Sequence, residues 1–426
     1  MNVYFEHITI TTESTVTTTN LHIIDGIVVH NSLEKSDIIT NDTTIIDSKN
    51  LTCLPGLFDM HVHFREPGQE YKETIESGCK SSANGGFTGV LCMPNTVPTI
   101  DHPSVVEYIN SKAKGNLVDV YSSAAITVKR EGSVLSPMRQ LHDCGVLMFT
   151  DDGSCLMDSQ LMRNAYDYVS DFDGLLSQHC EDHQLTKNFA MNEGAVSEKL
   201  GLKGYPTVAE EIIIARDIQL AQYCGNRRYH VSHMSTKGGV QLVKDAKARG
   251  QRITCEVTPH HFVLTDSAIE VHGTNAKMNP PLRTEEHRLA LIEGICNGTV
   301  DCIATDHAPH ASHEKIVDFS SAANGITGLE TSFALSYTTF VHSGLISLSQ
   351  LVGLMSTNPR SILKLPRISF EVGAKANITI VNENIEWTIA IDKHLSTSLN
   401  TPFNGMKVYG KPMYTINNSQ LFTCNL

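Results

Sequence analysis

The middle of the chain alternates short apolar runs with longer amphipathic stretches. Eight of the apolar runs are expected to form strands, and they cover residues 56–60, 88–93, 118–126, 145–149, 175–178, 229–233, 253–257 and 301–305. The stretches between them, such as TVAEEIIIARDIQLAQYCG and EEHRLALIEGICNG, have the spacing of amphipathic helices. This alternation indicates βα units around a parallel sheet. Eight units within residues 56–365 fit the size of a (β/α)8 TIM barrel, which is the predicted α/β architecture.

An open, doubly wound sheet is the alternative fold for this part of the chain. Such a sheet normally carries a glycine-rich phosphate-binding turn after its first strand. The chain here reads PGLFDMHVHF, which contains no such turn. The barrel is therefore favoured.

The two ends of the chain have a different pattern. Residues 1–55 and 366–426 contain short segments rich in Val, Ile, Thr and Tyr, which Asn, Asp and Gly interrupt. This pattern is typical of strands joined by turns. Neither end has enough residues for a core of its own. We therefore predict that the two ends pair into one small β-sandwich domain beside a barrel at residues 56–365.

Composition and charge exclude several classes of protein. Hydrophobic residues make up 41% of the 426 positions, which indicates a globular chain and not a disordered one. The net charge of −13 argues against a nucleic-acid partner, which would require a basic face. No apolar run is long enough to span a membrane, and the start MNVYFEHITI does not resemble a signal peptide. Since the eleven cysteines include no CxxC pair, we expect reduced thiols and a cytoplasmic protein.

Histidine is the residue type that points to chemistry, with twenty in the chain. His61 and His63 follow the first predicted strand, and residues two apart in an extended segment project to the same side. Two imidazoles held together suit a zinc-type ion. Two internally hydrogen-bonded histidines would produce the same pattern, so this pair alone does not decide between the two interpretations.

Histidine and carboxylate residues also follow four other predicted strands. They are Asp151 and Asp152 after the fourth, His179 after the fifth, His233 at the sixth, and Asp306 with His310 after the eighth. In a barrel these strand ends share the face that carries active sites. The residue types suit two divalent metals, which can activate a water molecule and polarise a carbonyl group. With a carboxylate to move the proton, hydrolysis of an amide C–N bond is the expected reaction class.

Two longer segments carry a family resemblance. DMHVHFREPG at 59–68 and ATDHAPHASHEK at 304–315 resemble the two signature segments of the dihydroorotases, in the amidohydrolase superfamily. HCEDH at 179–183, HVSHMSTK at 230–237 and KMNPPLR at 277–283 fit the same family in order and spacing. The resemblance covers essentially the whole chain. The HxH pair is shared across the superfamily, whereas ATDHAPH followed by Lys315 is much more specific.

The resemblance implies a zinc-dependent cyclic amide hydrolase that interconverts L-dihydroorotate and N-carbamoyl-L-aspartate in pyrimidine (UMP) biosynthesis. It implies two Zn²⁺ per subunit and a hydroxide that bridges them. The implied ligands are His61, His63 and Asp306 for one ion, His179 and His233 for the other, and Asp152 as the bridge. Many relatives bridge their metals with a carboxylated lysine, but the fourth strand reads LMFTDDG here, which favours the bacterial type with a bridging aspartate. Asp306 would also be the catalytic proton shuttle.

The resemblance also implies the substrate contacts. Arg65 can bind the ring carboxylate with two parallel hydrogen bonds. The other implied contacts are His63, Asn95, Asn279, His310, Asn324 and Gly325. The family often has Phe-Gly where this chain has Asn324-Gly325, which leaves the local packing in question. We further expect Asp59 and Glu181 to orient ligand histidines through their second ring nitrogen, and residues 311–328 to form a mobile loop that closes over the substrate.

Two other functions stay open at this point. Another cyclic amidase, of the allantoinase or hydantoinase type, would share the fold and the metals, but the missing lysine and the presence of Arg65 and Asn95 count against it. A non-catalytic scaffold for aspartate transcarbamoylase should have lost metal ligands, and all of the expected ones are present. The resemblance also implies a homo-oligomer, expected to be a dimer, and allows an active enzyme to form a complex with aspartate transcarbamoylase.

Overall fold

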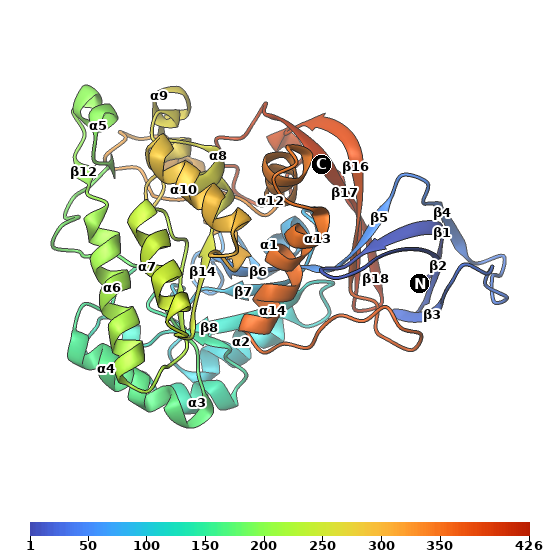
Figure 1. The fold of residues 1–426 in the computed structure, drawn as a ribbon, viewed down its shortest axis with the longest axis horizontal. Coiled ribbons are helices and arrows are strands. Elements are labelled where there is room, and N and C mark those ends of the chain that lie inside the picture. Colours follow the sequence, from blue (N-terminus) through green and yellow to red (C-terminus); the bar gives the residue numbers. More distant parts are fainter.

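The computed structural model describes residues 1–426 and contains two eight-stranded sheets and one short two-stranded pair. Figure 1 shows a helix-covered barrel beside a separate sheet to which both ends of the chain contribute. No helix has both the length and the apolar character needed to cross a lipid bilayer.

The barrel sheet contains the eight strands predicted from the apolar runs, in chain order and parallel to one another. They are β6 (Leu57–Val62), β7 (Phe87–Cys92), β8 (Asp119–Ala124), β9 (Met148–Phe149), β10 (Leu176–Gln178), β13 (Tyr229–Val231), β14 (Ile253–Val257) and β15 (Cys302–Ile303). A parallel bridge between Val62 and His307 joins the ends of the first and the last strand, so the sheet is nearly closed. The predicted TIM-barrel fold is therefore confirmed.

Helices that lie between these strands in the chain, or follow the last of them, surround the barrel (Figure 1). They are α1 (Ile75–Asn84), α2 (Pro103–Ala113), α3 (Met138–Asp143), α4 (Ser159–Tyr168), α5 (Ala195–Leu200), α6 (Val208–Tyr223), α7 (Lys237–Ala248), α8 (Pro259–Val263), α9 (Ala268–His272), α10 (Glu285–Cys296), α11 (Ser312–Lys315), α12 (Ser332–Ser336), α13 (Leu348–Val352) and α14 (Asn358–Ile362). Local sequence explains where they begin: Thr74 and Ser77 form a capping box at α1, and Pro103 occupies the first turn of α2. Their apolar faces and the strands share a core of 59 buried residues, which makes the barrel rigid.

The second sheet combines strands from both ends of the chain. Its members are β1 (Asn2–Thr11), β2 (Val16–Ile24), β3 (Ile27–Ser32), β4 (Thr44–Asp47), β5 (Thr52–Pro55), β16 (Ile378–Thr388), β17 (Lys407–Asn417) and β18 (Gln420–Thr423). The antiparallel pairing of β5 with β16 joins the two ends directly. A separate cluster of 13 buried residues, drawn from both ends, forms its core. Neither end could bury these residues alone, as the sequence indicates, while the limits 1–55, 56–365 and 366–426 stay a prediction.

Candidate metal centre

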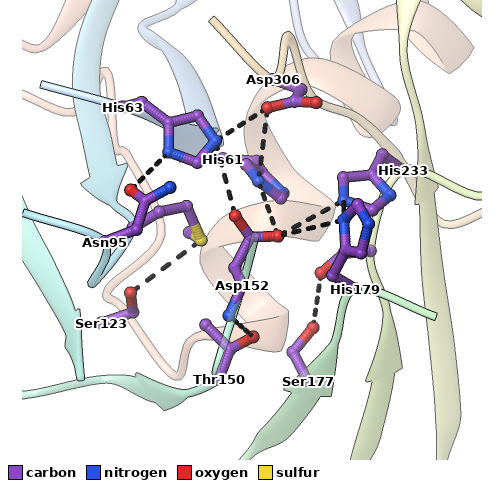
Figure 2. Close-up of polar contacts among 12 residues, drawn as sticks. His61, His63, Asn95, Ser123, Thr150, Asp152, Ser177, His179, His233 and Asp306 are labelled. Carbon is purple, nitrogen blue, oxygen red and sulfur yellow. Dashed lines mark hydrogen bonds and ion pairs between the residues drawn. The ribbon is translucent and has the colours of Figure 1, made fainter. Parts of the chain in front are cut away.

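Six side chains converge at the carboxyl ends of the barrel strands, as Figure 2 shows. They are His61 and His63 from β6 and the residue after it, Asp152 after β9, His179 after β10, His233 after β13 and Asp306 after β15. All six are at most 5% exposed. These polar and charged groups are thus removed from water. Their desolvation is unfavourable, and it must be offset by contacts among the six residues or by a bound cation.

Asp152 lies at the centre of this group. Its Oδ1 is 3.4 Å from His61 Nε2, 3.3 Å from His233 Nε2 and 3.9 Å from His179 Nδ1. Its Oδ2 is 3.5 Å from His63 Nε2. One carboxylate therefore faces both pairs of imidazoles, as a bridging ligand must. Burial opposes ionisation, but the neighbouring imidazoles, with His61 first, hold the pKa of Asp152 well below its usual range.

The neighbouring Asp151 points elsewhere. Its Oδ1 accepts a hydrogen bond of 3.0 Å from the backbone N–H of Thr127, and its Oδ2 accepts one from the hydroxyl of the same residue. Both oxygens are therefore occupied away from the imidazoles. Of the two adjacent aspartates, the geometry favours Asp152 as the one that can reach a metal.

Asp306 closes the group on the side of His63. Its Oδ1 is 2.9 Å from His63 Nε2 and 3.6 Å from His61 Nε2. Burial opposes ionisation here too, but His61 and His63 hold the pKa of Asp306 at about 2. Asp306 and His233 both have a positive φ, of 47° and 32°, which is uncommon for residues with a side chain. Such backbone strain clusters at functional sites, where it serves to aim a side chain.

The donor set fits divalent metal ions. His61 Nε2 is fully buried and forms no hydrogen bond within the protein, although it points at the two aspartates. His179 Nδ1 and His233 Nε2 lie only 2.9 Å apart. Three overlapping sets of three residues each place their ligand atoms within 4.8 Å of one another. Four imidazoles and two carboxylates are ligands that zinc and similar borderline ions prefer.

A further carboxylate, missed by the sequence analysis, supports the histidines. Glu256 on β14 places Oε1 2.6 Å from His61 Nδ1 and Oε2 3.2 Å from His230 Nε2, and it accepts a hydrogen bond from the backbone N–H of His233. The expectation for Asp59 is wrong, because that carboxylate accepts backbone N–H groups of His61 and Thr305 instead. The signal in the sequence is a glutamate inside the apolar run ITCEV, because a charged residue in a buried strand usually has a specific partner.

Glu181 does act on a histidine as expected. Its Oε2 lies 3.0 Å from His179 Nε2, so this ring has its Nδ1 free to face Asp152. Asn279 Nδ2 donates to the same carboxylate at 2.9 Å. The orientation of His179 is thus set by a carboxylate that contacts no other member of the group of six.

A cavity of about 250 Å³ opens above the six residues. Its lining includes five of the expected substrate contacts besides His63, namely Arg65, Asn95, Asn279, His310 and Asn324. Arg65 is 7% exposed and uses only its Nε within the protein, on the carbonyl oxygen of Pro309 at 3.2 Å. Its terminal nitrogens remain available to an anion. Gly325 does not line the cavity, because it lies behind Asn324 with its N–H bonded to the carbonyl oxygen of Lys277.

Comparisons with known proteins show which family this chain resembles. A family model described as "Dihydro-orotase-like" matches residues 51–239. A dihydroorotase from Syntrophus aciditrophicus is 47% identical over 379 residues, which are 89% of this chain and 88% of that protein. A dihydroorotase from Chlorobaculum tepidum is 49% identical over 391 residues, or 89% of each chain.

The similar solved structures show the fold alone, because their identities lie below 25%. The L-hydantoinase (dihydropyrimidinase) from Arthrobacter aurescens has a TM-score of 0.88 at 24% identity and covers 100% of this chain and 96% of its own. The dihydropyrimidinase from Brevibacillus agri has a TM-score of 0.85 at 21% identity, with 100% and 95% covered. The barrel with its added sheet is therefore a fold that this chain shares with these two proteins.

Proposed function

This chain belongs to the dihydroorotase family, whose reaction interconverts L-dihydroorotate and N-carbamoyl-L-aspartate. We propose that this reaction takes place at a two-zinc centre held by the six converging side chains. The observation that carries the proposal is the central position of Asp152 between two pairs of histidines. His61, His63 and Asp306 would hold one ion, His179 and His233 the other, with Asp152 between them. When bound, such ions polarise a carbonyl group and lower the pKa of a water molecule.

Asp306 has the position to move the proton. Hydrolysis breaks the amide C–N bond of the ring, adds the oxygen of water to the carbonyl carbon, and transfers a proton from that water to the leaving nitrogen. Asp306 is ionised and lines the cavity, so its free oxygen can accept this proton and then donate it. In ring closure the same carboxyl group first accepts a proton from the attacking nitrogen and then donates it to the leaving water oxygen.

Arg65 is proposed to bind the ring carboxylate of the substrate, together with Asn95 and His310. Its guanidinium is buried, has no carboxylate partner within the protein, and lines the cavity. A planar fork matches the two oxygens of a carboxylate better than the single ammonium of lysine does. Because the chain carries a net charge of −13, capture of an anion depends on this local cation and on the metals.

Replacing Arg65 with lysine is expected to raise KM for dihydroorotate by roughly 10- to 100-fold, because a charge-assisted hydrogen bond is lost while the charge remains. The zinc content should not change, since Arg65 is not among the ligands. Steady-state kinetics and metal analysis of the purified variant test both statements. An unchanged KM would remove Arg65 from the proposed carboxylate site.

Replacing Glu256 with glutamine is expected to weaken zinc binding by roughly 10- to 100-fold, because His61 and the backbone of His233 lose their charged acceptor. Competition with a coloured chelator measures the affinity. Glu330→Gln is the matched control, because Glu330 is also a buried carboxylate but accepts its hydrogen bonds away from the six residues, from side chains of α1 and from the backbone N–H groups of Leu395 and Ser396. Equal zinc affinity in the two variants would contradict a role of Glu256 in the metal centre.

The substrate assignment is tested with a panel of rings. The purified, zinc-loaded protein is expected to hydrolyse L-dihydroorotate and not allantoin, hydantoin or dihydrouracil, and a chelator should abolish the activity. Turnover of another ring would leave the proposed mechanism in place but would show that the substrate assignment is wrong. Absence of all turnover with metal bound would favour the scaffold for aspartate transcarbamoylase.

A cytoplasmic location, a dimer and a complex with that enzyme are likewise proposed, and size-exclusion chromatography with light scattering tests the last two.

A further inference from the structure

Two buried lysines beside the cavity have no part in the functions assigned above. Lys277 directly precedes Met278 and Asn279, which line the cavity, and Lys315 ends α11 and completes the second signature segment. Each is 3% exposed. Neither ammonium group lies within ion-pair distance of a carboxylate, whereas buried cations are usually paired.

Both lysines donate instead to the backbone of one short segment. Lys277 Nζ donates to the carbonyl oxygens of Ser320 and Ala322 at 3.0 and 2.7 Å. Lys315 Nζ donates to those of Ala323 and Gly325 at 2.9 and 3.1 Å. Four carbonyl oxygens within six residues therefore accept hydrogen bonds from two cations, which use the several donors that an ammonium offers.

The segment held in this way forms one wall of the substrate cavity. Asn324 lines the cavity, and its carbonyl oxygen lies 2.9 Å from His310 Nε2. Gly325 is fixed on two further sides: its N–H donates to the carbonyl oxygen of Lys277, and its carbonyl oxygen accepts from Asn400 Nδ2 at 3.0 Å. Moving residues 320–325 would therefore displace Asn324 and would break the contact of His310 with it.

Burial of the two cations is unfavourable in itself. Burial, with the charge of Lys277 as a smaller cause, lowers the pKa of Lys315 to about 7. The three donors of an ammonium match the three carbonyl oxygens around Lys315 Nζ, those of Lys277, Ala323 and Gly325, whereas a neutral NH2 group could serve only two of them. Two cations behind the wall also favour an anionic ligand in front of it, in a chain whose net charge of −13 opposes one.

We propose that Lys277 and Lys315 are positioning residues that hold residues 320–325 as a fixed wall of the cavity and thereby place Asn324 and His310 for the substrate. The identity of the substrate rests on the proposed function, whereas the fixed position of residues 320–325 does not. The proposal departs from the expectation of a freely moving loop over residues 311–328. The chain after α11 is held by backbone contacts that any closing motion would have to break.

Hydrogen–deuterium exchange of the full-length, zinc-loaded enzyme tests the wall. Peptides covering residues 316–326 are expected to be protected in the unaltered protein, and to exchange at least tenfold faster in Lys315→Met and in Lys277→Met. Peptides from β6 and β13 should not change. In the same preparations KM for dihydroorotate is expected to rise about tenfold, whereas kcat should stay within threefold and the zinc content should not change. Loss of stability alone would not change KM without changing kcat.

Lys247→Met is the matched control. Lys247 also donates to a backbone carbonyl oxygen, that of Thr299 at 2.7 Å, and it is ion-paired with Asp301 at 2.6 Å, near the amino end of β15 at the opposite end of the barrel. Its KM and its exchange at residues 316–326 should equal those of the unaltered enzyme. A change there as large as in Lys315→Met would overturn the proposal.

Three further outcomes overturn it. Exchange of residues 316–326 at unprotected rates in the unaltered protein would show that no fixed wall exists. Faster exchange with unchanged KM in both variants would show that the wall does not position substrate contacts. Unchanged exchange in both variants would show that the lysines do not hold it. If dihydroorotate is not turned over, the proposed function fails by itself, and the exchange experiment still decides about the wall. If one variant does not fold, the other decides.

Discussion

Asp306→Asn is expected to lower kcat by about 10³-fold in both directions of the reaction. The amide keeps the size of the side chain but can neither accept the proton of the attacking water nor donate one to the leaving nitrogen. General acid–base groups typically contribute 10²- to 10⁴-fold, so a loss of this size identifies the proton shuttle. Zinc should be retained, because His61, His63 and Asp152 remain beside it. Steady-state rates and metal analysis of the same preparation give both quantities.

A suitable control lies at the other end of the same strand. Asp301 immediately precedes β15, whereas Asp306 follows it, so Asp301→Asn changes an aspartate at the opposite end of the barrel. This control should keep kcat. A kcat of Asp306→Asn within tenfold of the unaltered enzyme, with zinc still bound, would contradict the assignment of Asp306 as the proton shuttle.

The second large effect is expected at Asp152. Replacing it with asparagine removes the one negative charge that faces all four imidazoles, so the protein should lose most of its bound zinc and its activity with it. The loss should exceed the roughly 10- to 100-fold that outer partners of metal ligands contribute. Elemental analysis after dialysis against a weak chelator measures the retained metal.

The adjacent aspartate provides the control for this experiment. Asp151→Asn should retain zinc, because the oxygens of Asp151 accept hydrogen bonds from Thr127 and do not face the imidazoles. Loss of zinc in Asp151→Asn but not in Asp152→Asn would reverse the assignment of the bridging ligand. Retention of zinc in both would show that no aspartate of this pair bridges the metals.

The sequence predicted the barrel well for a physical reason. A strand buried on both faces is a continuous apolar run, and such runs are visible without knowledge of the fold. Their ends were less certain: the sixth strand stops at Val231, so His233 lies beyond it, in a backbone conformation with positive φ that aims its ring at Asp152. That turn depends on tertiary contacts and has no local signature.

The features of the site that could not be predicted from the sequence are contacts between segments far apart in the chain. Glu256 reaches His61 across 195 positions, and nothing in the strand ITCEV indicates which histidine it meets. Asp59 contacts backbone N–H groups of His61 and Thr305 and not the ring nitrogen that the sequence suggests. The carbonyl contacts of Lys277 and Lys315 are equally invisible, because a sequence shows side chains and not which backbone atoms they reach.

Six side chains at one end of the barrel are proposed to form a metal centre that hydrolyses dihydroorotate. Titration of zinc into the metal-free protein, with bound zinc and dihydroorotate hydrolysis measured in the same samples, tests it most directly. We expect no hydrolysis without metal, and a rate that rises with bound zinc until about two ions are held per chain. Full hydrolysis by the metal-free protein, or saturated zinc binding without hydrolysis, would contradict it.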